Sequence, residues 1–292
     1  MFKKRRQYIF VYAVKDANPN GDPLNDNHPR YDEETEQIQV SDVRIKRTVR
    51  DEWVRIGETV FVDGEPKTMA NRYNELKKTL NTVNGKDTMA KCIDTRLFGV
   101  TFSHGNKETF SWTGPVQFQW GRSLNKQRVQ MIQGTAAFST KEGNEQRSFR
   151  SEYIVPYSII ATTAIANETA SETTSASDDD LEALKEALWE GTRNLITRSK
   201  MEHRPLLLME ITYNEDARTH ISALEEYLKL TTPNGEKMTD DEQLKIRSIN
   251  DFGIDISDLQ AKLANMKDVI EDINIQTDDR LTLIDLSAVQ QG

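Results

Sequence analysis

The sequence predicts an α+β protein built around the element order strand, helix, strand, strand, helix, strand. Two observations predict this class. Four β-rich apolar runs are present, and two amphipathic segments with helical spacing lie among them. With 292 residues, of which 36% are hydrophobic, the chain is long enough to bury a real core. This order is that of a split βαβ domain.

The first strand and the first helix lie near the N-terminus. Residues 8–14, YIFVYAV, form a short apolar run typical of a central strand, which stops at a loop dense in Asn, Pro and Gly. Ser41 is placed to cap a helix over residues 41–56. The residues that recur at helical spacing and predict its buried stripe are Ile45, Val49, Trp53 and Ile56.

The second strand is predicted over residues 110–120, where large apolar and polar side chains alternate. Its expected core face carries Phe110, Trp112, Val116, Phe118 and Trp120. Residues 121–125, GRSLN, read as a turn that directs a cation and two hydrogen-bonding side chains away from the strand end. Such a surface suits a polyanion better than a small reactive substrate.

The remaining core elements follow in the second half of the chain. A strand is predicted over residues 153–166, and a low-complexity stretch leads from it to a helix that Ser177 or Asp178 can cap. The face of this helix carries Leu181, Leu184, Leu188, Leu195 and Ile196. The last clear core strand begins at Pro205.

Two segments interrupt this core, and a third follows it. Residues 57–109 look like an insertion, and residues 127–152 look like a projecting hairpin or long loop. From residue 214 onward the chain is acidic, with helical patches predicted at 221–230 and 256–273 and a final strand predicted at 280–286. The expected boundaries are 1–56, 57–109, 110–126, 127–152, 153–213 and 214–292.

Charge is distributed unevenly along the chain. The formal net charge is −9, yet residues 1–152 hold 25 Lys and Arg against 20 Asp and Glu, while residues 153–292 hold 13 against 27. The halves therefore carry +5 and −14, which allows a basic surface on an acidic protein. From charge alone, two solvated halves are an equally good interpretation.

Composition also bears on the compartment. No apolar run approaches the length of a membrane span, and the N-terminus lacks the features of a signal peptide. Cys92 is the single cysteine, so an internal disulfide and a cysteine-rich zinc site are excluded. We expect a cytoplasmic protein without a membrane partner.

The loop after the first strand partly matches a calcium-binding pattern. Asp16, Asn18, Asn20, Gly21 and Asp22 fit its first half, but position twelve is Asn27 instead of a bidentate glutamate. The carboxylates that could hold a divalent metal are Asp16, Asp22, Asp26 and Asp32. Their spacing is not diagnostic, so a structural, solvated loop is favoured.

No common enzyme signature is present. The chain lacks a Walker loop, a GxGxxG fingerprint, a GxSxG elbow and an HExxH motif. Tyr8, Phe10 and Tyr12 could stack bases as RRM sheet aromatics do, but the RNP1 consensus is absent and we expect them in the core.

Cations gather in the first helix. Arg44, Lys46, Arg47 and Arg50 fall within seven residues, a pattern that favours phosphate contact over a merely solvated face. A second, weaker group follows the second helix and could instead complement its dipole. This group contains Arg198, Lys200, His203 and Arg204.

Six motifs, in this order, resemble the backbone subunit of type I CRISPR surveillance complexes, the "Cas seven" superfamily of RAMP proteins. They are NPNGDP (18–23), SDVRIKR (41–47), DTRLFG (94–99), TGPVQFQWGRSLN (113–125), YIVPYSI (153–159) and GTRNLITRSK (191–200). The resemblance covers roughly residues 8–213, in the Csh/Csd branch, and is closer to the type I-B Csh group.

The resemblance implies a ferredoxin-like or RRM-like palm, a helical finger at 57–109 and a β-hairpin thumb at 127–152. Copies of the chain would stack as a filament along a guide crRNA, and the guide would pair with a target DNA strand. The other expected partners are the large, cap and crRNA-processing subunits of Cascade. It implies no catalysis, no cofactor and no metal. Two alternatives stay open: a metal-dependent ribonuclease of the same fold, cutting with a loop aspartate, and a protein-only structural oligomer.

The resemblance and the cation pattern together give the expected site residues. Those expected to bind RNA are Asn18, Asn20, Arg30, Ser41, Arg44, Lys46, Arg47, Arg50, Gln119, Arg122, Ser123, Asn125, Arg198, Lys200, His203 and Arg204. Those expected to wedge at a kink in the guide are Met131, Gln133, Thr135 and Phe138 in the thumb.

Overall fold

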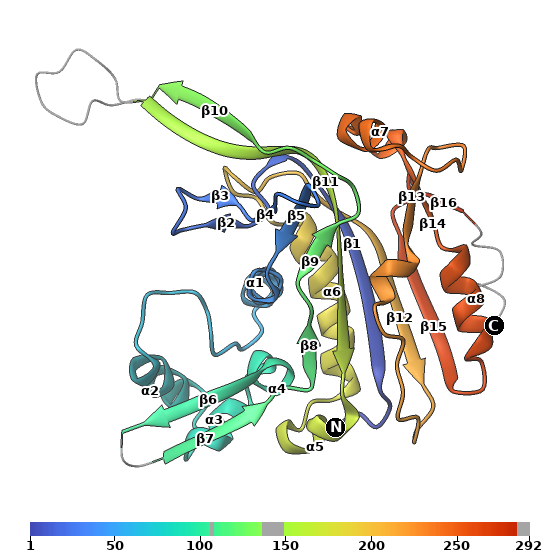
Figure 1. Ribbon diagram of the computed structural model, residues 1–292. Coiled ribbons are helices and arrows are strands. Elements are labelled where there is room, and N and C mark those ends of the chain that lie inside the picture. Colours follow the sequence, from blue (N-terminus) through green and yellow to red (C-terminus); the bar gives the residue numbers. More distant parts are fainter. Residues whose placement is uncertain (106–107, 136–148, 285–292) are drawn as a thin grey trace, which may run out of the picture.

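The computed structural model describes residues 1–105, 108–135 and 149–284 and shows an α+β fold, as predicted (Figure 1). Its main sheet is antiparallel, and β1 lies between β11 and β12 at its centre. The strands run in the order β15 (Ile270–Thr277), β12 (His203–Tyr213), β1 (Arg6–Ala17), β11 (Phe149–Ala166), β9 (Gly121–Ser123), β5 (Gln37–Val40) and β4 (Tyr31–Asp32). Two more, β8 (Val116–Phe118) and β10 (Gln130–Thr135), also pair with β11.

Helices α1 (Asp42–Arg55) and α6 (Asp178–Arg193) cover one face of this sheet (Figure 1). Tyr8, Phe10 and Tyr12 are buried beneath them, as expected of core residues. Ser177 caps α6 in a reciprocal capping box with Asp180. Ile56 and Ile196 were predicted to lie on the buried faces of these helices, and both predictions were wrong. The two residues lie beyond the helix ends and are 52% and 74% exposed.

The C-terminal region covers the opposite face. Ile9 and Val11 of β1 pack there against Phe252, Ile254 and Leu259. The region comprises η1 (Leu224–Tyr227), β13 (Lys229–Thr231), α7 (Asp240–Lys245), η2 (Ile249–Asp251), β14 (Gly253–Asp255), α8 (Ser257–Asn265), β15 and β16 (Thr282–Ile284). The expected helical patch around residues 221–230 is instead a short 3₁₀ turn and a strand, and residues 270–273 belong to β15. Because this face is covered, it cannot serve as an open base-stacking platform.

Residues between α1 and β8 form a smaller layer with a core of their own (Figure 1). It contains α2 (Met69–Thr79), α3 (Gly85–Ala90), α4 (Ile93–Phe98), β6 (Gly99–His104) and β7 (Glu108–Thr113). Tyr73, Met89 and Phe102 are buried there, and Phe110 and Trp112 pack against them. The aromatic residues of the predicted second strand are thus divided between two cores.

The predicted strand over 110–120 is two strands, and this part of the sequence prediction was wrong. β7 pairs with β6, whereas β8 pairs with β11. The chain breaks at Gly114 and Pro115, where a Cβ on Gly114 would lie 2.1 Å from the carbonyl carbon of Phe98. Since proline also lacks the N–H that a central ladder needs, a continuous strand cannot form.

We expect Gly114→Ala to destabilise the protein by about 1–3 kcal/mol, because the added methyl meets backbone atoms that cannot rotate away. Urea unfolding monitored by circular dichroism measures this loss. Gly134→Ala is the matched control, since a methyl group added there would meet nothing within 4 Å. Equal stability of the two variants would contradict the close approach of residues 98 and 114.

A β-bulge follows β8 and explains a second error. Phe118 pairs with Ala164 and Arg122 pairs with Ala161, so residues 119–121 face only residues 162–163. The one-residue excess reverses the alternation, because each position beyond it points to the other side of the sheet. Trp120, predicted in the core, is therefore 50% exposed. The predicted turn at 121–125 begins as strand β9.

A hairpin arm projects from the sheet, formed by β10 and the first residues of β11 (Figure 1). Its register runs from Gln130 opposite Ile154 to Thr135 opposite Phe149. Phe138 lies outside the described residues. A second, short hairpin, β2 (Gly21–Asp22) with β3 (His28–Pro29), follows β1, and the low-complexity stretch contains α5 (Glu168–Thr174). Within the described residues no helix is long and apolar enough to cross a membrane.

Candidate nucleic-acid interface

The loop after β1 is attached to the start of α1. The Oδ1 atom of Asn20 accepts a hydrogen bond from the Ser41 backbone N–H at 2.7 Å. Asn18 donates from Nδ2 to the Asn27 carbonyl at 2.7 Å, and its own backbone N–H donates to the Ser199 carbonyl at 2.8 Å. Since Asn18, Asn20 and Ser41 are all buried, these predicted RNA-binding residues hold three chain segments together.

Two of the four α1 cations face the smaller layer. Arg50 donates from Nε to Asp94 at 2.9 Å and lies 5.1 Å above the ring of Phe98. Lys46 pairs with Asp42 at 3.2 Å and lies 5.7 Å from the same ring. Both charges already have an anionic partner and an aromatic face within the chain.

Arg47 also has partners within the chain. Its guanidinium group forms an ion pair with Asp51, one turn further along α1, and donates to the Asp63 carbonyl at 3.3 Å. The side chain is about one-third exposed. Arg47 therefore holds the loop that leads from α1 to α2.

Arg44 differs from its three neighbours, because it forms no ion pair with a described carboxylate and its Nη2 donates only to Thr48 Oγ1, at 3.0 Å. Lys200, likewise without a described anionic partner, lies close enough for the two cations to repel each other. Burial lowers the pKa of both side chains. The fold thus brings together two cations from distant segments, neither of which has a carboxylate within ion-pair distance among the described residues, although Asp51 attracts Arg44 from further away.

His203 completes this cluster. Its ring stacks on Tyr12 at 6.1 Å between centroids, and the backbone of Met201 is the polar group that approaches its ring nitrogens. Burial, and then repulsion from Arg44 and Lys200, lower its pKa to about 3. The residues lining the adjacent cleft include Tyr12, Pro19, Arg44, Thr48, Leu195 and His203. We call Arg44, Lys200 and His203 the cation cluster.

Arg204 and Arg198 lie apart from the cation cluster. Arg204 sits opposite Ala13 on the covered face of the sheet, because successive strand residues point to opposite sides. Its guanidinium group binds buried Asp278 through two hydrogen bonds of 2.6 and 2.7 Å. Arg198 is 65% exposed and contacts Glu152 at 3.4 Å. Arg204 therefore anchors the end of β15, while Arg198 remains accessible.

Ser123 and Asn125 are almost fully buried and hold the chain after the bulge. Ser123 Oγ accepts from the Ile38 backbone N–H at 3.0 Å and donates to the Asn125 carbonyl at 2.7 Å. Asn125 donates to the Tyr157 carbonyl at 3.0 Å and accepts from the Ile159 N–H at 2.9 Å. Both side chains are committed to backbone partners, so neither offers a phosphate a free polar group in this conformation.

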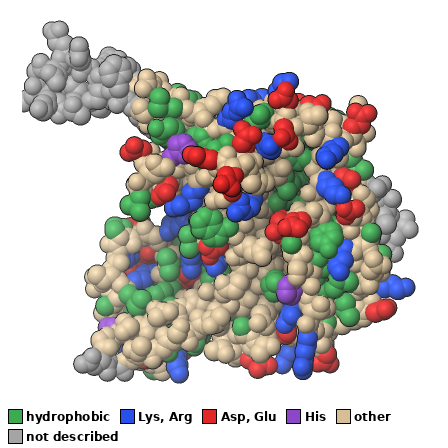
Figure 2. Space-filling model, viewed as in Figure 1, with side chains coloured by type: hydrophobic (Ala, Val, Ile, Leu, Met, Phe, Trp, Pro, Cys, Tyr) green, Lys and Arg blue, Asp and Glu red, His purple; other side chains and the backbone are tan. Residues whose placement is uncertain are grey.

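The exposed residues near the bulge form a different surface. Arg122 is 51% exposed and donates to Asp32 at 3.2 Å, while Gln119 is exposed and accepts from Thr163 Oγ1. Arg30 contacts Asp22 at 3.4 Å and lies 5.9 Å from the centre of the Trp120 ring. Figure 2 shows Lys and Arg side chains beside hydrophobic ones on this side of the molecule.

A groove of about 660 Å³ lies at the base of the hairpin arm. Its lining comes from the loop after β1, from both arm strands and from residues 197–199. Asn18, Gln130, Tyr153 and Arg198 are among these residues. Met131 and Gln133, predicted to wedge at a kink, are exposed on β10, and Thr135 lies at its described end.

The four carboxylates that could have held a divalent metal, on Asp16, Asp22, Asp26 and Asp32, do not meet at one point. Asp22 accepts from Arg30 and from the Leu24 backbone N–H, and Asp32 accepts from Arg122. Asp16 and Asp26 both line the groove at the base of the arm. Within the described ranges, no group of three or more His, Cys, Asp or Glu side chains could hold a metal ion.

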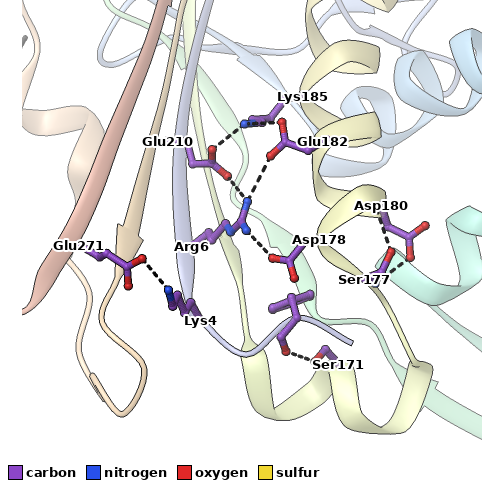
Figure 3. A network of polar contacts seen from close by, with 11 residues as sticks. Lys4, Arg6, Ser171, Ser177, Asp178, Asp180, Glu182, Lys185, Glu210 and Glu271 are labelled. Carbon is purple, nitrogen blue, oxygen red and sulfur yellow. Dashed lines mark hydrogen bonds and ion pairs between the residues drawn. The ribbon is translucent and has the colours of Figure 1, made fainter.

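On the other side of α6, by contrast, cations and carboxylates are matched (Figure 3). Arg6 contacts Glu210 at 3.0 Å and Glu182 at 3.3 Å, and it also pairs with Asp178. Lys185 pairs with Glu210 at 2.7 Å. This network joins α6 to β1 and β12 and leaves no positive charge to attract an anion, unlike the cation cluster.

Sequence reasoning missed two residues. The sequence marks Asp94 only as part of the motif DTRLFG, although a carboxylate directly after Cys92 and Ile93 and shortly before Leu97 is a signal for a buried, paired charge. Trp120 was assigned to the core, and nothing in the alternation of the sequence marks the bulge that turns it outward.

Known proteins resemble the chain over most of its length. A family model described as CRISPR-associated protein Cas7 matches residues 4–257. A protein of Haloferax volcanii, named CRISPR-associated protein Cas7, is 29% identical over 309 residues, covering 96% of this chain and 88% of its own length. A chain of the solved structure "CRISPR RNA-guided surveillance complex, pre-nicking" aligns with a TM-score of 0.57 over 96% of both chains. At 12% identity, that likeness is one of fold.

Proposed function

Because this chain belongs to the CRISPR-associated protein Cas7 family, we propose that it is a non-catalytic guide-RNA-binding backbone subunit of a CRISPR surveillance complex. The observation that carries the proposal is the cation cluster. Repulsion from Arg44 lowers the pKa of Lys200, and neither side chain has a carboxylate within ion-pair distance among the described residues, although burying like charges is unfavourable. Two phosphates of the guide, one beside each side chain, would compensate both charges.

The fold supports the same proposal. The strand order β12, β1, β11, β9 with α1 and α6 on one face is that expected of a ferredoxin-like palm. We assign the smaller layer between α1 and β8 to the finger and the hairpin arm to the thumb. In such an assembly the guide reads sequence by base pairing with target DNA, so the protein needs backbone contacts rather than a base-reading code.

The proposed guide path runs from the groove at the base of the arm past the loop after β1. Asn18 lines this groove and is bonded to Ser199, next to Lys200. Along this path, the cation cluster is therefore the next feature after the groove. Copies of the chain would continue the path, each arm covering RNA held by its neighbour, with the other subunits of Cascade at the ends.

We expect the double variant Arg44→Gln/Lys200→Gln to bind single-stranded RNA roughly tenfold more weakly at moderate salt. The slope of log affinity against log salt should fall by about 1.4, since each lost phosphate contact on a single strand removes about 0.7. Fluorescence anisotropy with labelled RNA, repeated across salt concentrations, measures both quantities.

Lys245→Gln/Lys267→Gln is the matched control, because it removes the same charge from exposed positions on the C-terminal region. The control should bind RNA like the wild type. Unchanged affinity and salt slope in the Arg44/Lys200 variant would refute the proposed phosphate site. Gel analysis of the RNA after incubation with Mg²⁺ tests the non-catalytic role, since regularly spaced cuts would show a nuclease instead.

A further inference from the structure

The bulge after β8 directs an aromatic side chain into solvent. Trp120 is 50% exposed, although a large aromatic ring normally gains stability from burial. The bulge itself is firmly held, because the Gln119 N–H donates to the Thr163 carbonyl at 2.9 Å and Thr162 Oγ1 donates to the Gln119 carbonyl at 3.0 Å. Bulges of this kind frequently re-aim side chains next to functional sites.

A cation accompanies the exposed ring. Arg30 lies 5.9 Å from the ring centre, and its buried Nε has no hydrogen-bond partner among the described residues. Its contact with Asp22 is long, at 3.4 Å. Arg122, within the next strand, also points outward and is 51% exposed.

A short chain of hydrogen bonds connects this surface with the cation cluster. The Arg30 N–H donates to the Asn20 carbonyl at 3.0 Å, and the Asn20 side chain accepts from Ser41 at the start of α1. Arg44 lies one turn further along that helix. The exposed Trp120 ring and the partly exposed Arg30 side chain therefore lie on a segment that is bonded to the start of α1, the helix that carries Arg44.

We propose that Trp120 and Arg30 form a stacking platform for one nucleobase of the bound single-stranded RNA. The base stacks on the exposed face of the Trp120 indole ring. The Arg30 guanidinium group contacts the adjoining phosphate or stacks beside the indole ring against the same base. Stacking of this kind tolerates any sequence, because every base has a π-face. The inference rests on the proposed function and adds a contact to bases that the phosphate site does not provide.

The test compares two ligands of equal charge: a short oligouridine and an abasic ribose–phosphate oligomer of the same length. Full-length Trp120→Leu should bind oligouridine roughly tenfold more weakly than the wild type, because stacking on one aromatic side chain is lost. It should bind the abasic oligomer as the wild type does. Trp120→Phe, which keeps an aromatic ring, should retain most of the affinity for oligouridine.

Val83→Ala is the matched control, since Val83 is 75% exposed in the smaller layer and should leave both affinities unchanged. An equal loss for both ligands in Trp120→Leu would overturn the proposal and give Trp120 a structural role. Unchanged affinity for both would overturn it as well, while the Arg44/Lys200 variant still tests the proposed function separately. Altered self-association of Trp120→Leu without RNA, at unchanged RNA affinity, would assign the ring to a protein contact instead.

Discussion

Asp94→Ala is expected to destabilise the protein by about 3–5 kcal/mol, the usual cost of removing one partner from a buried ion pair. Asp94 is fully buried. Its carboxylate accepts from Arg50 Nε at 2.9 Å and from the backbone N–H groups of Phe61 and Val62 at 2.7 and 3.1 Å. Removing it leaves one cation and two N–H groups without their acceptor.

Asp94 also joins two parts of the fold. It lies at the start of α4 in the smaller layer, whereas Arg50 belongs to α1, which packs on the main sheet. Losing this contact should therefore loosen the smaller layer before the main sheet unfolds. Amide hydrogen exchange would detect this as faster exchange in residues 57–113 than in β1 and β11.

The matched control for Asp94 is Asp51→Ala. Asp51 pairs with Arg47 on the same helix but is about 39% exposed, so its loss should cost at most about 1 kcal/mol. A similar cost for both substitutions would contradict the assignment of Asp94 as an anchoring residue. The Arg50–Asp94 ion pair also makes Arg50→Glu unsuitable for testing RNA binding, because the new carboxylate would face the carboxylate of Asp94 and destabilise the fold.

The second large effect is acid sensitivity caused by His203. Its pKa is lowered to about 3 in the fold by burial and by Arg44 and Lys200, against an unperturbed value of 6.5. The unfolded chain therefore binds more protons than the folded chain between these two values. The stabilising contribution is fully present above pH 6.5 and is lost as the pH falls.

Between pH 7 and pH 4 this contribution should decrease by about 3 kcal/mol. Urea unfolding across that range measures it. His203→Phe keeps a ring against Tyr12 but cannot titrate, so its stability should fall less steeply with pH. His220→Gln, at an exposed position, should retain the wild-type slope.

Equal slopes in the wild type and His203→Phe would contradict the burial of a histidine that stays neutral in the folded protein. Bound RNA should reduce the acid sensitivity of the wild type, because a phosphate beside the cation cluster favours the protonated ring. This second measurement connects the pH effect to the proposed function.

The core elements were predictable because each depends on a local pattern. The apolar run 8–14, the stripe of Ile45, Val49 and Trp53, and the capped helix after Ser177 each form the expected element. Of the two interpretations of residues 127–152, a projecting hairpin or a long loop, the pairing of β10 with β11 agrees with the hairpin. In these cases neighbouring residues alone determine which side chains are buried.

The errors arose where distant segments meet. The strand over 110–120 breaks because Gly114 touches the backbone at Phe98, and the burial of Trp120 fails because of a single extra residue opposite 162–163. Neither contact leaves a trace in the alternation of side chains. The C-terminal strand β15 likewise completes the main sheet, although its first four residues read as the end of a helix.

The sequence by itself determined the α+β class, the order of the core elements and the cation-rich first helix of this Cas7 family member. Only the tertiary structure decided which of these cations lack an ion-pair partner among the described residues. Lys46, Arg47 and Arg50 are matched by carboxylates, Arg204 is turned to the opposite face, and Arg44 meets Lys200 and His203. The physical reason is that local periodicity fixes the direction of a side chain, whereas its electrostatic partner depends on which distant segment folds beside it.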